Sequence, residues 1–539
     1  MKHPAASRLV QQVVVVAVLG ASGCSLISGS YEGDHPGKRT ADHTVSAKPG
    51  DATGGHHVRS GWAGVSNNRY TLDVHRVERY AKYSVLYVDL TLKAGTGMLG
   101  AAFGDDAEDA SFTRFRLLDP VNGKYYRPLR EGDSDGKTFG SRMGDYPGAA
   151  AGVRHVLQLY FPPVPSGVSQ LTVLTPGTTG EMTGIPVVSG AAKDAPLPRP
   201  NAEKTGTPHF FRVYPPTGKV YSDVTDLHDY IEGEQKTTST GGGEQKLALR
   251  ADVLFAFDKA TLSSKATQVL DNAIEETRDR ADPAKPPITI TGYTDSKGGD
   301  TYNLKLSRRR AQAVEKYVSA KLGSAYRYRT AGKGEADPVA ANTHHDGSDD
   351  PAGRAKNRRV EIGYKLKETT PRTTTTTSAT PGPGGVSSPA AFRTGGDGPV
   401  IGSSPGHVAG FSKARVDVHP FYRDGAYMVG VFTVHNTGSQ VMSAGFEVNY
   451  TGDAMPHAMG GADYGGIIAT DTAHRTRYYQ EREGGFDHGT AGFVNGEVDG
   501  VEADADNRLY VYYPAPPAGV TKVDVSVGDR GTIRNVPIR

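Results

Sequence analysis

The chain has 539 residues and a formal net charge of +2, with 61 Lys and Arg against 59 Asp and Glu. This balance gives no global electrostatic reason to expect nucleic acid or an acidic membrane surface as a partner. The length suggests about three or four domains, and the content of Gly (68), Pro (34) and Tyr (27) favours strands, turns and linkers over long helices.

The N-terminus has the pattern of an export signal over residues 1–23. Lys2 and Arg8 precede a mostly apolar stretch, Leu9–Gly23, which is shorter than the ~20 apolar residues of a membrane-spanning helix. Cys24, the only cysteine, follows directly, so neither an intramolecular disulfide nor a Cys-based zinc site is expected. The stretch resembles a bacterial lipobox, although Ala21 stands where Leu is usual. The resemblance implies diacylglycerol on Cys24, and ordinary cleavage that leaves a secreted protein with a free thiol is the alternative.

Residues 24–58 are rich in Ser, Gly, Asp and His, which predicts a flexible tether. Residues 59–190 then show the apolar–polar alternation of half-buried strands, for instance in "YTLDVHRVERY" and "YSVLYVDLTL". Asn122-Gly123 marks a tight turn between two further strands. We therefore expect a first all-β domain here.

Residues 405–539 look like a second copy of that domain. "LDVH" at 72–75 corresponds to "VDVH" at 416–419, and "YFPPVPSGVSQLTV" at 160–173 corresponds to "YYPAPPAGVTKVDV" at 512–525. Many short strands without a helical pattern favour immunoglobulin-like sandwiches, although the Cys…Trp…Cys hallmark is absent. Both copies resemble the small sandwich domains of bacterial surface lipoproteins.

The region between the copies, residues 205–367 with a core at 247–367, alternates strand and helix patterns. "ADVLFAFDKATL" (251–262) predicts a strand with Val253, Phe255 and Phe257 on one face, followed by a helix over 261–280. "PPITITGYTDS" predicts the next strand and "TYNLKLSRRRAQAVEKYVSAKL" the next helix. This βαβαβ order predicts an α/β domain with its helices on one face of the sheet. Residues 368–404 have the composition of a disordered linker.

Five motifs of this middle region occur in a recognisable order: "LFAFDKATL", "GYTDSKG", "YNLKLSRRRAQAV", "GKGEADPVA" and "NRRVEI". In this order they resemble the OmpA-like C-terminal domain. The resemblance covers residues 247–367 and implies non-covalent binding of peptidoglycan through the diaminopimelate residue of its stem peptide. It implies no cofactor and no catalytic group.

The free end of diaminopimelate is a zwitterion, so its site needs one anion and one cation. Arg suits the ligand carboxylate because its guanidinium donates two parallel hydrogen bonds. Asp295, after the second strand, is expected to take the ammonium, and Arg310, on the second helix, the carboxylate. Asn303 lies about two helical turns before Arg310 on the same side, with Leu306 between them. Backbone N–H groups at 296–300, where this helix begins, are candidate donors to the carboxylate.

The resemblance also implies a role for Thr294, before the aspartate, and for one of two late arginines, Arg358 and Arg359. Neighbouring strand residues face opposite ways, so only one of the two faces the site, and we favour Arg359. An Asp–Arg pair by itself is usually a surface ion pair that contributes ~0–1 kcal/mol. The ordered motifs, and not the spacing, therefore carry the binding hypothesis.

One polar segment offers a competing interpretation as a metal cluster. Residues 340–355 contain His344, His345, Asp346, Asp349 and Asp350, but their spacing fits no standard metal site, and we expect a flexible loop. No metal is therefore predicted. The sequence contains no Gly-x-Ser-x-Gly, His-Glu-x-x-His or P-loop motif, so we expect no enzyme.

These features predict an exported, lipid-anchored protein of the cell envelope that tethers a membrane to the cell wall. The membrane is the cytoplasmic one, on its outer face, or the outer membrane where the organism has one. The alternative is a surface adhesin that binds a protein or glycan partner through its two β-sandwich domains.

Overall fold

The computed structural model describes residues 56–63, 68–95, 103–104, 111–142, 149, 151–197, 211–285, 287–344, 346–367, 388–394, 396–408, 411–441, 466–483, 494–496, 501–528 and 530–539. The expected signal peptide, the lipid site Cys24 and nearly all of the expected tether lie outside these residues. Among the helices that are described, none combines the length and apolarity needed to cross a bilayer.

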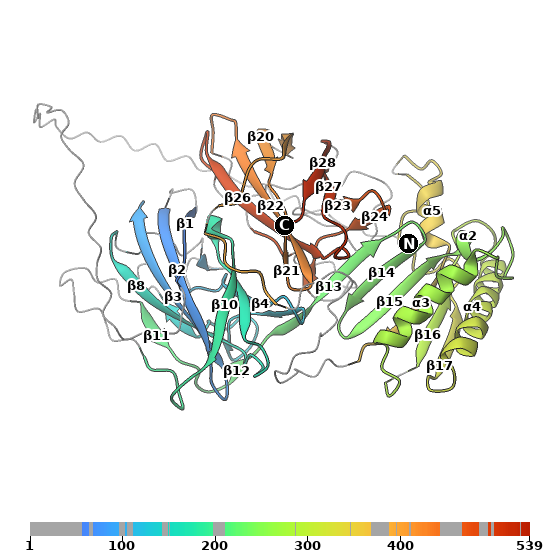
Figure 1. Cartoon of the computed structure of the whole chain (residues 1–539), viewed down its shortest axis with the longest axis horizontal. Helices are drawn as coiled ribbons and strands as arrows, with labels where there is room; N and C mark the ends of the chain where they lie inside the picture. Colours follow the sequence, from blue (N-terminus) through green and yellow to red (C-terminus); the bar gives the residue numbers. More distant parts are fainter. Residues whose placement is uncertain are drawn as a thin grey trace, which may run out of the picture. The chain divides into compact units, whose positions relative to one another are not determined.

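The first β-rich domain is built from two rows of strands around one apolar core (Figure 1). The first row is β1 (His57–Ala63), β2 (Asn68–Arg79), β3 (Ser84–Ala94) and β8 (Arg154–Phe161). The second row is β5 (Lys124–Tyr126), β4 (Arg116–Asp119), β9 (Gln170–Leu174) and β10 (Glu181–Ser189). Shorter elements are β6 (Arg130–Glu131), β7 (Gly140–Arg142) and a 3-10 turn at Gly177–Thr179.

The second β-rich domain repeats this strand order. Its first row is β19 (Gly402–Val408), β20 (Phe411–Val418), β22 (Tyr427–Asn436) and β26 (Asp506–Pro514). Its second row is β24 (Thr476–Tyr478), β23 (Ile467–Asp471), β27 (Lys522–Val527) and β28 (Thr532–Pro537). Two short strands complete it, β21 (Tyr422–Asp424) and β25 (Arg482–Glu483). The "LDVH" motif lies on β2, and the "VDVH" motif lies at the end of the corresponding strand β20, with His419 directly after it.

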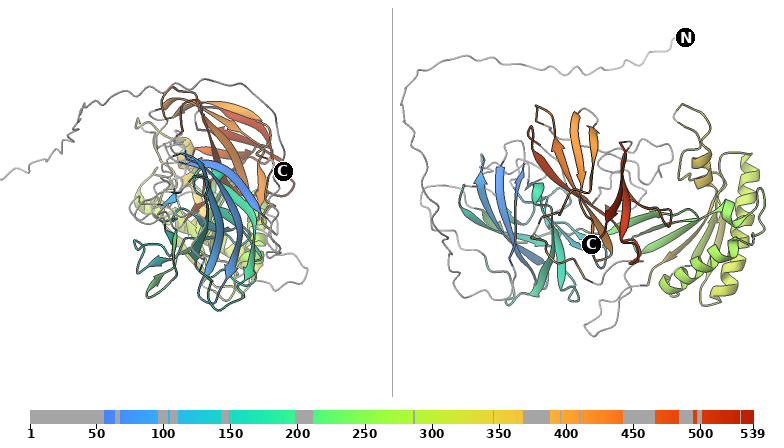
Figure 2. Two further views of the ribbon diagram at one scale, coloured as in Figure 1. Left: turned by 90° about the vertical axis from the view of Figure 1, so that its left-hand side faces the viewer. Right: turned by 45° about the horizontal axis from the view of Figure 1, so that its top comes forward.

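The middle domain is a mixed sheet in the order β14-β15-β18-β16-β17, in which only β16 and β17 are parallel. Its elements are β13 (Val224–Glu232), β14 (Lys236–Gly241), β15 (Glu244–Arg250), α2 (Ala251–Leu254), α3 (Ala266–Arg280), β16 (Ile288–Gly292), α4 (Asp300–Leu322), β17 (Tyr328–Gly332), α5 (Pro351–Asn357) and β18 (Arg359–Lys365). Helices α3 and α4 lie on the same side of the sheet, as the right-hand view of Figure 2 also shows. The apolar stripe of α3 and the Leu306–Val314 face of α4 are buried there, as their periodicity predicted.

The start of this domain differs from the prediction. Residues 251–254 form a helical turn and not a strand, and Phe257 is 96% exposed. The chain reverses at Asp258, whose φ is +59°, and Phe255 pairs with Leu262 across this turn. Helix α3 begins at Ala266 and not at 261. In the turn before it, the Ala266 N–H donates to the Oγ of Ser263.

Two of the predicted boundaries, the domain start at 205 and the linker over 368–404, differ from the observed contacts. Two strands after residue 205, β11 (Arg212–Tyr214) and β12 (Val220–Tyr221), pair with β7 and β6 of the first β-rich domain. The expectation of a disordered linker over 368–404 is wrong for the part that is described, 388–394 and 396–404. In that part Phe392 lies edge-on against His57 at 5.1 Å, and Asp397 accepts two hydrogen bonds from Arg508.

Strand β13 pairs with strands of all three domains. It pairs with β14 of its own domain, with β5 of the first β-rich domain, and with β24 and β25 of the second. Asp229 of this strand and the buried Glu481 are two carboxyl groups near enough to act on each other's pKa. Burial, followed by the Asp229 charge, raises the pKa of Glu481 well above its usual range, and burial raises the pKa of Asp229 to about 6. Two buried carboxyl groups that raise each other's cost of ionisation do not both lose their protons until the pH exceeds their usual range.

This pair predicts that stability falls as the pH rises. Both carboxyl groups titrate higher in the folded chain than their unfolded values near pH 4, so their contribution is complete below about pH 4 and is lost through pH 6 and above. Glu481→Gln removes one charge without changing the shape of the side chain. We expect this variant to melt like the wild type at pH 4 and to be about 1–3 kcal/mol more stable at pH 8.

Differential scanning calorimetry between pH 4 and 8 measures this difference. Glu244→Gln is the control, because Glu244 is a half-exposed partner of Lys365. A Glu481→Gln variant that loses stability equally at both pH values would contradict the raised pKa values assigned to this pair.

Candidate functional site

Asp295 is positioned by the end of strand β16. It follows Gly292 by three residues, and its side chain is largely buried. One carboxylate oxygen accepts the Lys297 N–H at 3.1 Å, and the other accepts Nη1 of Arg358 at 2.7 Å. Nε of Arg354 lies 3.8 Å from the second oxygen. A carboxylate offers about four acceptor positions, so Asp295 is fixed in place with acceptor capacity remaining for a ligand.

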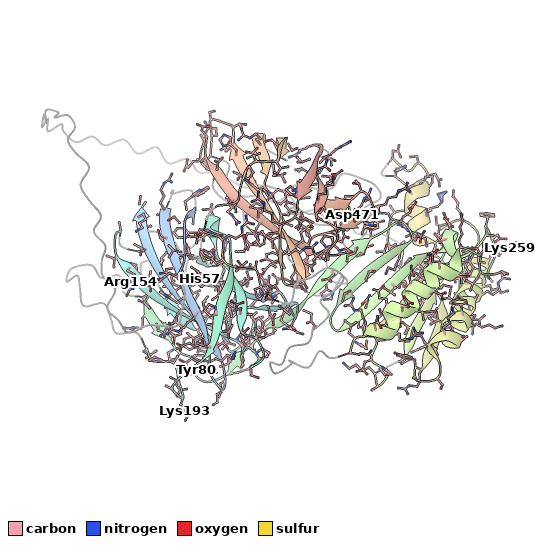
Figure 3. The ribbon with its side chains drawn as sticks, viewed as in Figure 1. His57, Tyr80, Arg154, Lys193, Lys259 and Asp471 are labelled. Atoms are coloured by element: carbon pink, nitrogen blue, oxygen red, sulfur yellow. The ribbon has the colours of Figure 1, made fainter. Side chains whose placement is uncertain are left out.

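Arg310 is a buried cation on helix α4. Its side chain is on the buried face of the helix, and the residue is 5% exposed. Nε donates to the carbonyl of Lys259 at 3.0 Å, and the guanidinium lies 5.2 Å from the centre of the Phe255 ring. Lys259 is labelled in Figure 3, beside the helices of this domain.

The charge of Arg310 is not matched by a close carboxylate. No carboxylate of the described residues lies within ion-pair distance of it, although Asp252, Asp258 and Asp295 are near enough to act on its pKa. Burial lowers the pKa of Arg310, and the nearby Asp252 and Asp258 charges oppose that shift. The guanidinium therefore retains its terminal nitrogens for an incoming anion.

The remaining predicted residues adjoin Asp295 or lie on the same helix as Arg310. Asn303 is buried, and its Nδ2 donates to the carbonyl of Asp295 at 3.4 Å and to Glu335 at 3.0 Å. Leu306 is buried on the same face of α4. The Oγ1 of Thr294 is buried without a hydrogen-bond partner among the described residues. A buried hydroxyl of this kind calls for an additional partner, such as water or a ligand.

The preference for Arg359 over Arg358 was wrong. The two side chains do leave the chain in opposite directions, as strand alternation requires. Arg358, however, is the one that reaches Asp295, and it also forms two hydrogen bonds with Asp252, at 3.0 and 2.6 Å. Arg359 turns away to Glu361 and stacks on Tyr293, with its guanidinium 3.7 Å from the ring centre.

Helix α5 brings Arg354 and Arg358 to the site, and it replaces part of the expected flexible loop. Asp350 is its N-cap and accepts the N–H groups of Ala352 and Gly353, both at 2.9 Å. Proline follows at the first helical position. This Asp-Pro pair is a helix-start signal that the sequence analysis did not use.

The carboxylates of this segment are engaged in the fold. Asp349 accepts two hydrogen bonds from Nη1 of Arg354, and Asp346 accepts from Ser348. His345 lies outside the described residues. Among the described residues, the segment forms no group of His and carboxylate side chains spaced to hold a metal.

The site thus has one carboxylate, Asp295, after the carboxyl end of β16, and one guanidinium, Arg310, on helix α4. Among the described residues, no carboxylate forms an ion pair with this guanidinium. This class of site suits a small ligand that carries both an ammonium and a carboxylate. The described part of it contains no hydroxyl or thiol nucleophile paired with a base.

A comparison with known families identifies the middle domain. Residues 254–350 match the model described as the OmpA family, so the chain contains an OmpA-like domain. Similar proteins include outer membrane protein A of Bordetella avium, 41% identical over 22% of this chain and 56% of that protein. Outer membrane protein A of Klebsiella aerogenes is 40% identical over 23% of this chain and 37% of that protein.

A third relative is the photosystem I P700 chlorophyll a apoprotein A2 of Gloeobacter violaceus, 40% identical over 25% of this chain and 15% of that protein. The chain therefore spans at most about half the length of these relatives. Among solved structures, the cell wall anchor of the T6SS from Pseudomonas aeruginosa is 28% identical, with 25% of this chain and 90% of that chain covered at a TM-score of 0.21. The peptidoglycan-associated lipoprotein from Burkholderia pseudomallei is also 28% identical, with 21% and 88% covered at a TM-score of 0.17.

The capping role of Asp350 predicts a local effect of its removal. Asp350→Ala leaves two N–H groups of α5 without their acceptor, which costs about 1 kcal/mol. Amide hydrogen exchange over residues 352–358, measured by mass spectrometry, should then be about fivefold faster. Asp346→Ala is the control, because Asp346 bonds only to the exposed Ser348 among the contacts described. Unchanged exchange in Asp350→Ala would contradict the capping role.

Proposed function

We propose that this chain binds peptidoglycan non-covalently, through the diaminopimelate of the stem peptide, at the Asp295–Arg310 site of its OmpA-like domain. The observation that supports this most strongly is the buried Arg310 guanidinium without a carboxylate of its own. A carboxylate from the ligand supplies the missing anion, and the guanidinium holds it through two hydrogen bonds.

The ammonium of the same ligand end is assigned to Asp295. This carboxylate already accepts hydrogen bonds from the Lys297 N–H and from Arg358, which hold it in place. Binding of the ligand ammonium therefore carries little additional entropic cost for ordering the Asp295 side chain. Thr294 Oγ1 is a further polar group at the site that lacks a partner. Arg358 takes the place that the sequence had favoured for Arg359.

At the level of the whole chain, we propose a lipid-anchored tether of the cell envelope. The lipobox-like sequence at Cys24 supports an anchor in the membrane, and the OmpA-like domain supplies the contact with the wall. The repeated strand order supports two immunoglobulin-like sandwiches beside it. Binding at such a site is reversible, and many copies along a continuous polymer give a firm overall attachment from individually weak contacts. The role is one of binding and not of catalysis.

The site predicts which substitutions weaken retention on diaminopimelate-type wall. Arg310→Lys keeps the charge but loses the planar fork, and Asp295→Asn keeps the shape but loses the charge. Charged hydrogen bonds contribute ~1.5–3 kcal/mol each, so either variant should bind at least about tenfold more weakly in sedimentation with purified sacculi.

Arg309→Lys is the matched control, because Arg309 is the exposed neighbour of Arg310 on the same helix. It should bind like the wild type. Folding of each variant is verified by its circular dichroism and melting temperature. Equal retention of wild type, Arg310→Lys and Asp295→Asn would move the wall contact elsewhere in the chain.

A further inference from the structure

A second group of polar side chains lies on the first β-rich domain. Strands β1 and β2 are antiparallel, with His57 opposite Val74 and Val58 opposite Asp73. Continued by one residue, this register sets His56 opposite His75. Directly opposed residues share a face of the sheet, as do residues two apart on one strand. The register therefore places His56, Asp73 and His75 together on one face.

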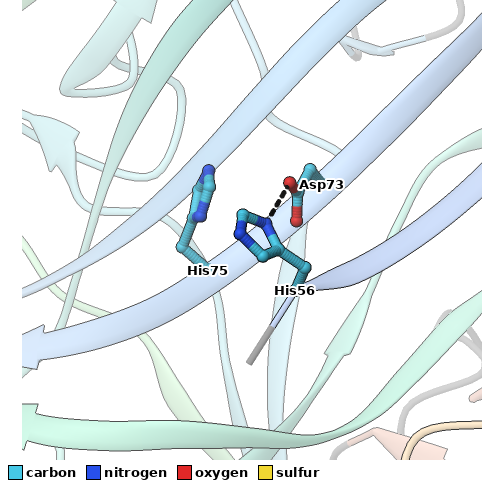
Figure 4. A group of neighbouring side chains, drawn as sticks. All are labelled: His56, Asp73 and His75. Atoms are coloured by element: carbon cyan, nitrogen blue, oxygen red, sulfur yellow. Dashed lines mark hydrogen bonds and ion pairs between the residues drawn. The ribbon is translucent and has the colours of Figure 1, made fainter. Parts of the chain in front are cut away.

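The side chains converge there. Nδ1 of His56 is 2.7 Å from Oδ2 of Asp73, and the rings of His56 and His75 meet edge-on with their centres 5.7 Å apart. One ligand-type atom from each of the three residues lies within 4.8 Å of the other two. Figure 4 shows the three side chains pointing toward one another. His75 is the extra residue of a β-bulge in β2, and bulges of this kind redirect a side chain.

The carboxylates of this face are only partly compensated by their neighbours. Asp73 lies directly opposite Asp89 of β3, and like charges in that arrangement destabilise a sheet. Arg154 reaches Asp89 at 3.0 Å. Oδ1 of Asp73 is buried without a hydrogen-bond partner among the described residues. A cation between the imidazoles and Asp73 would reduce the repulsion between Asp73 and Asp89 and would compensate the Asp73 carboxylate, whose Oδ1 lacks a partner among the described residues.

Asp89 supplies the support that a metal-binding histidine usually has. Nε2 of His75 lies 3.1 Å from Oδ2 of Asp89, which leaves Nδ1 of His75 for a metal. A carboxylate that holds the second ring nitrogen fixes the orientation of the imidazole and increases its basicity as a ligand.

The second β-rich domain provides an internal comparison. Asp417 and His419 correspond to Asp73 and His75 in the repeated motif, and Ile401 corresponds to His56. In that copy Arg415 donates two hydrogen bonds to Asp417. Nδ1 of His419 donates to the carbonyl of Gly398, and Nε2 of His419 shares a hydrogen bond with the Thr433 hydroxyl. The second copy thus satisfies its aspartate and histidine internally, whereas the first copy leaves Asp73 incompletely paired and adds a second imidazole.

We propose that His56, Asp73 and His75 form a binding site for a divalent transition-metal cation of the Zn²⁺ class. Two imidazole nitrogens and one carboxylate oxygen are the donors that Zn²⁺ and Cu²⁺ take in proteins, whereas Ca²⁺ and Mg²⁺ require mostly oxygen ligands. His56 is 71% exposed, so an ion reaches the site from solvent, and a water molecule completes the coordination. Bound metal links the residue that precedes β1 to the middle of β2.

The test is a calorimetric titration of the untagged full chain with Zn²⁺, compared with Ca²⁺. His56→Ile gives the first copy the side chain that the second copy carries, and because His56 is exposed the variant should fold normally. We expect Zn²⁺ to bind the wild type and to bind His56→Ile and His75→Gln at least about tenfold more weakly, with no binding of Ca²⁺. Asp89→Asn should weaken Zn²⁺ binding by about tenfold.

His435→Ala is the matched control. His435 pairs with Asp504 and Asp506 on the second β-rich domain and belongs to no group of metal-ligating side chains among the described residues. It should bind Zn²⁺ like the wild type. Equal Zn²⁺ affinity in wild type, His56→Ile and His75→Gln would overturn the proposal, as would a folded wild type that binds no Zn²⁺.

Discussion

The proposed binding site depends on one buried cation, Arg310. Helix α4 presents it on the face that also carries Leu306 and Val314, so the guanidinium is desolvated together with the apolar core. A desolvated charge is tolerated only when its surroundings compensate for the lost water. Here the compensation consists of one carbonyl and one aromatic face, with three aspartates at longer range. Under the proposed function, the guanidinium is already held in place before the ligand carboxylate binds, which reduces the ordering cost of binding.

The arrangement of the other charged residues keeps carboxylates of the chain away from Arg310. Arg358 occupies Asp252 and Asp295, so neither carboxylate is drawn into a direct ion pair with Arg310. The N-cap at Asp350 starts the helix that ends at Asn357, and this fixes the direction in which Arg358 leaves the chain. Around this domain the chain uses one β-rich fold twice, and strand β13 pairs with both copies. The two copies of the fold differ at corresponding positions, for example at His56 in the first copy and Ile401 in the second.

The sequence predicted the parts of the site that reside in contiguous motifs. Asp295, Asn303 and Arg310 were placed correctly relative to strand and helix because helical periodicity and the strand end are local properties. The choice between Arg358 and Arg359 failed because strand alternation shows only that the two side chains point in opposite directions. Which of them points toward Asp295 depends on where helix α5 ends, and the strand pattern does not show that. Phe257 was assigned to a strand because Val253, Phe255 and Phe257 occupy every second position. Residues 251–254 instead form a helical turn, and the chain reverses at Asp258. The His56–Asp73–His75 group needs a cross-strand register and a bulge, which no local pattern reveals.

The most direct test of the account compares two kinds of purified cell wall. One carries diaminopimelate in its stem peptides, and the other carries lysine at the same position. Lysine has the ammonium but lacks the carboxylate at its end, so it offers Arg310 no anion. The account predicts that the full chain sediments with diaminopimelate-type wall and binds lysine-type wall at least about tenfold more weakly. Equal retention on both walls would contradict the assignment of Arg310 to a ligand carboxylate.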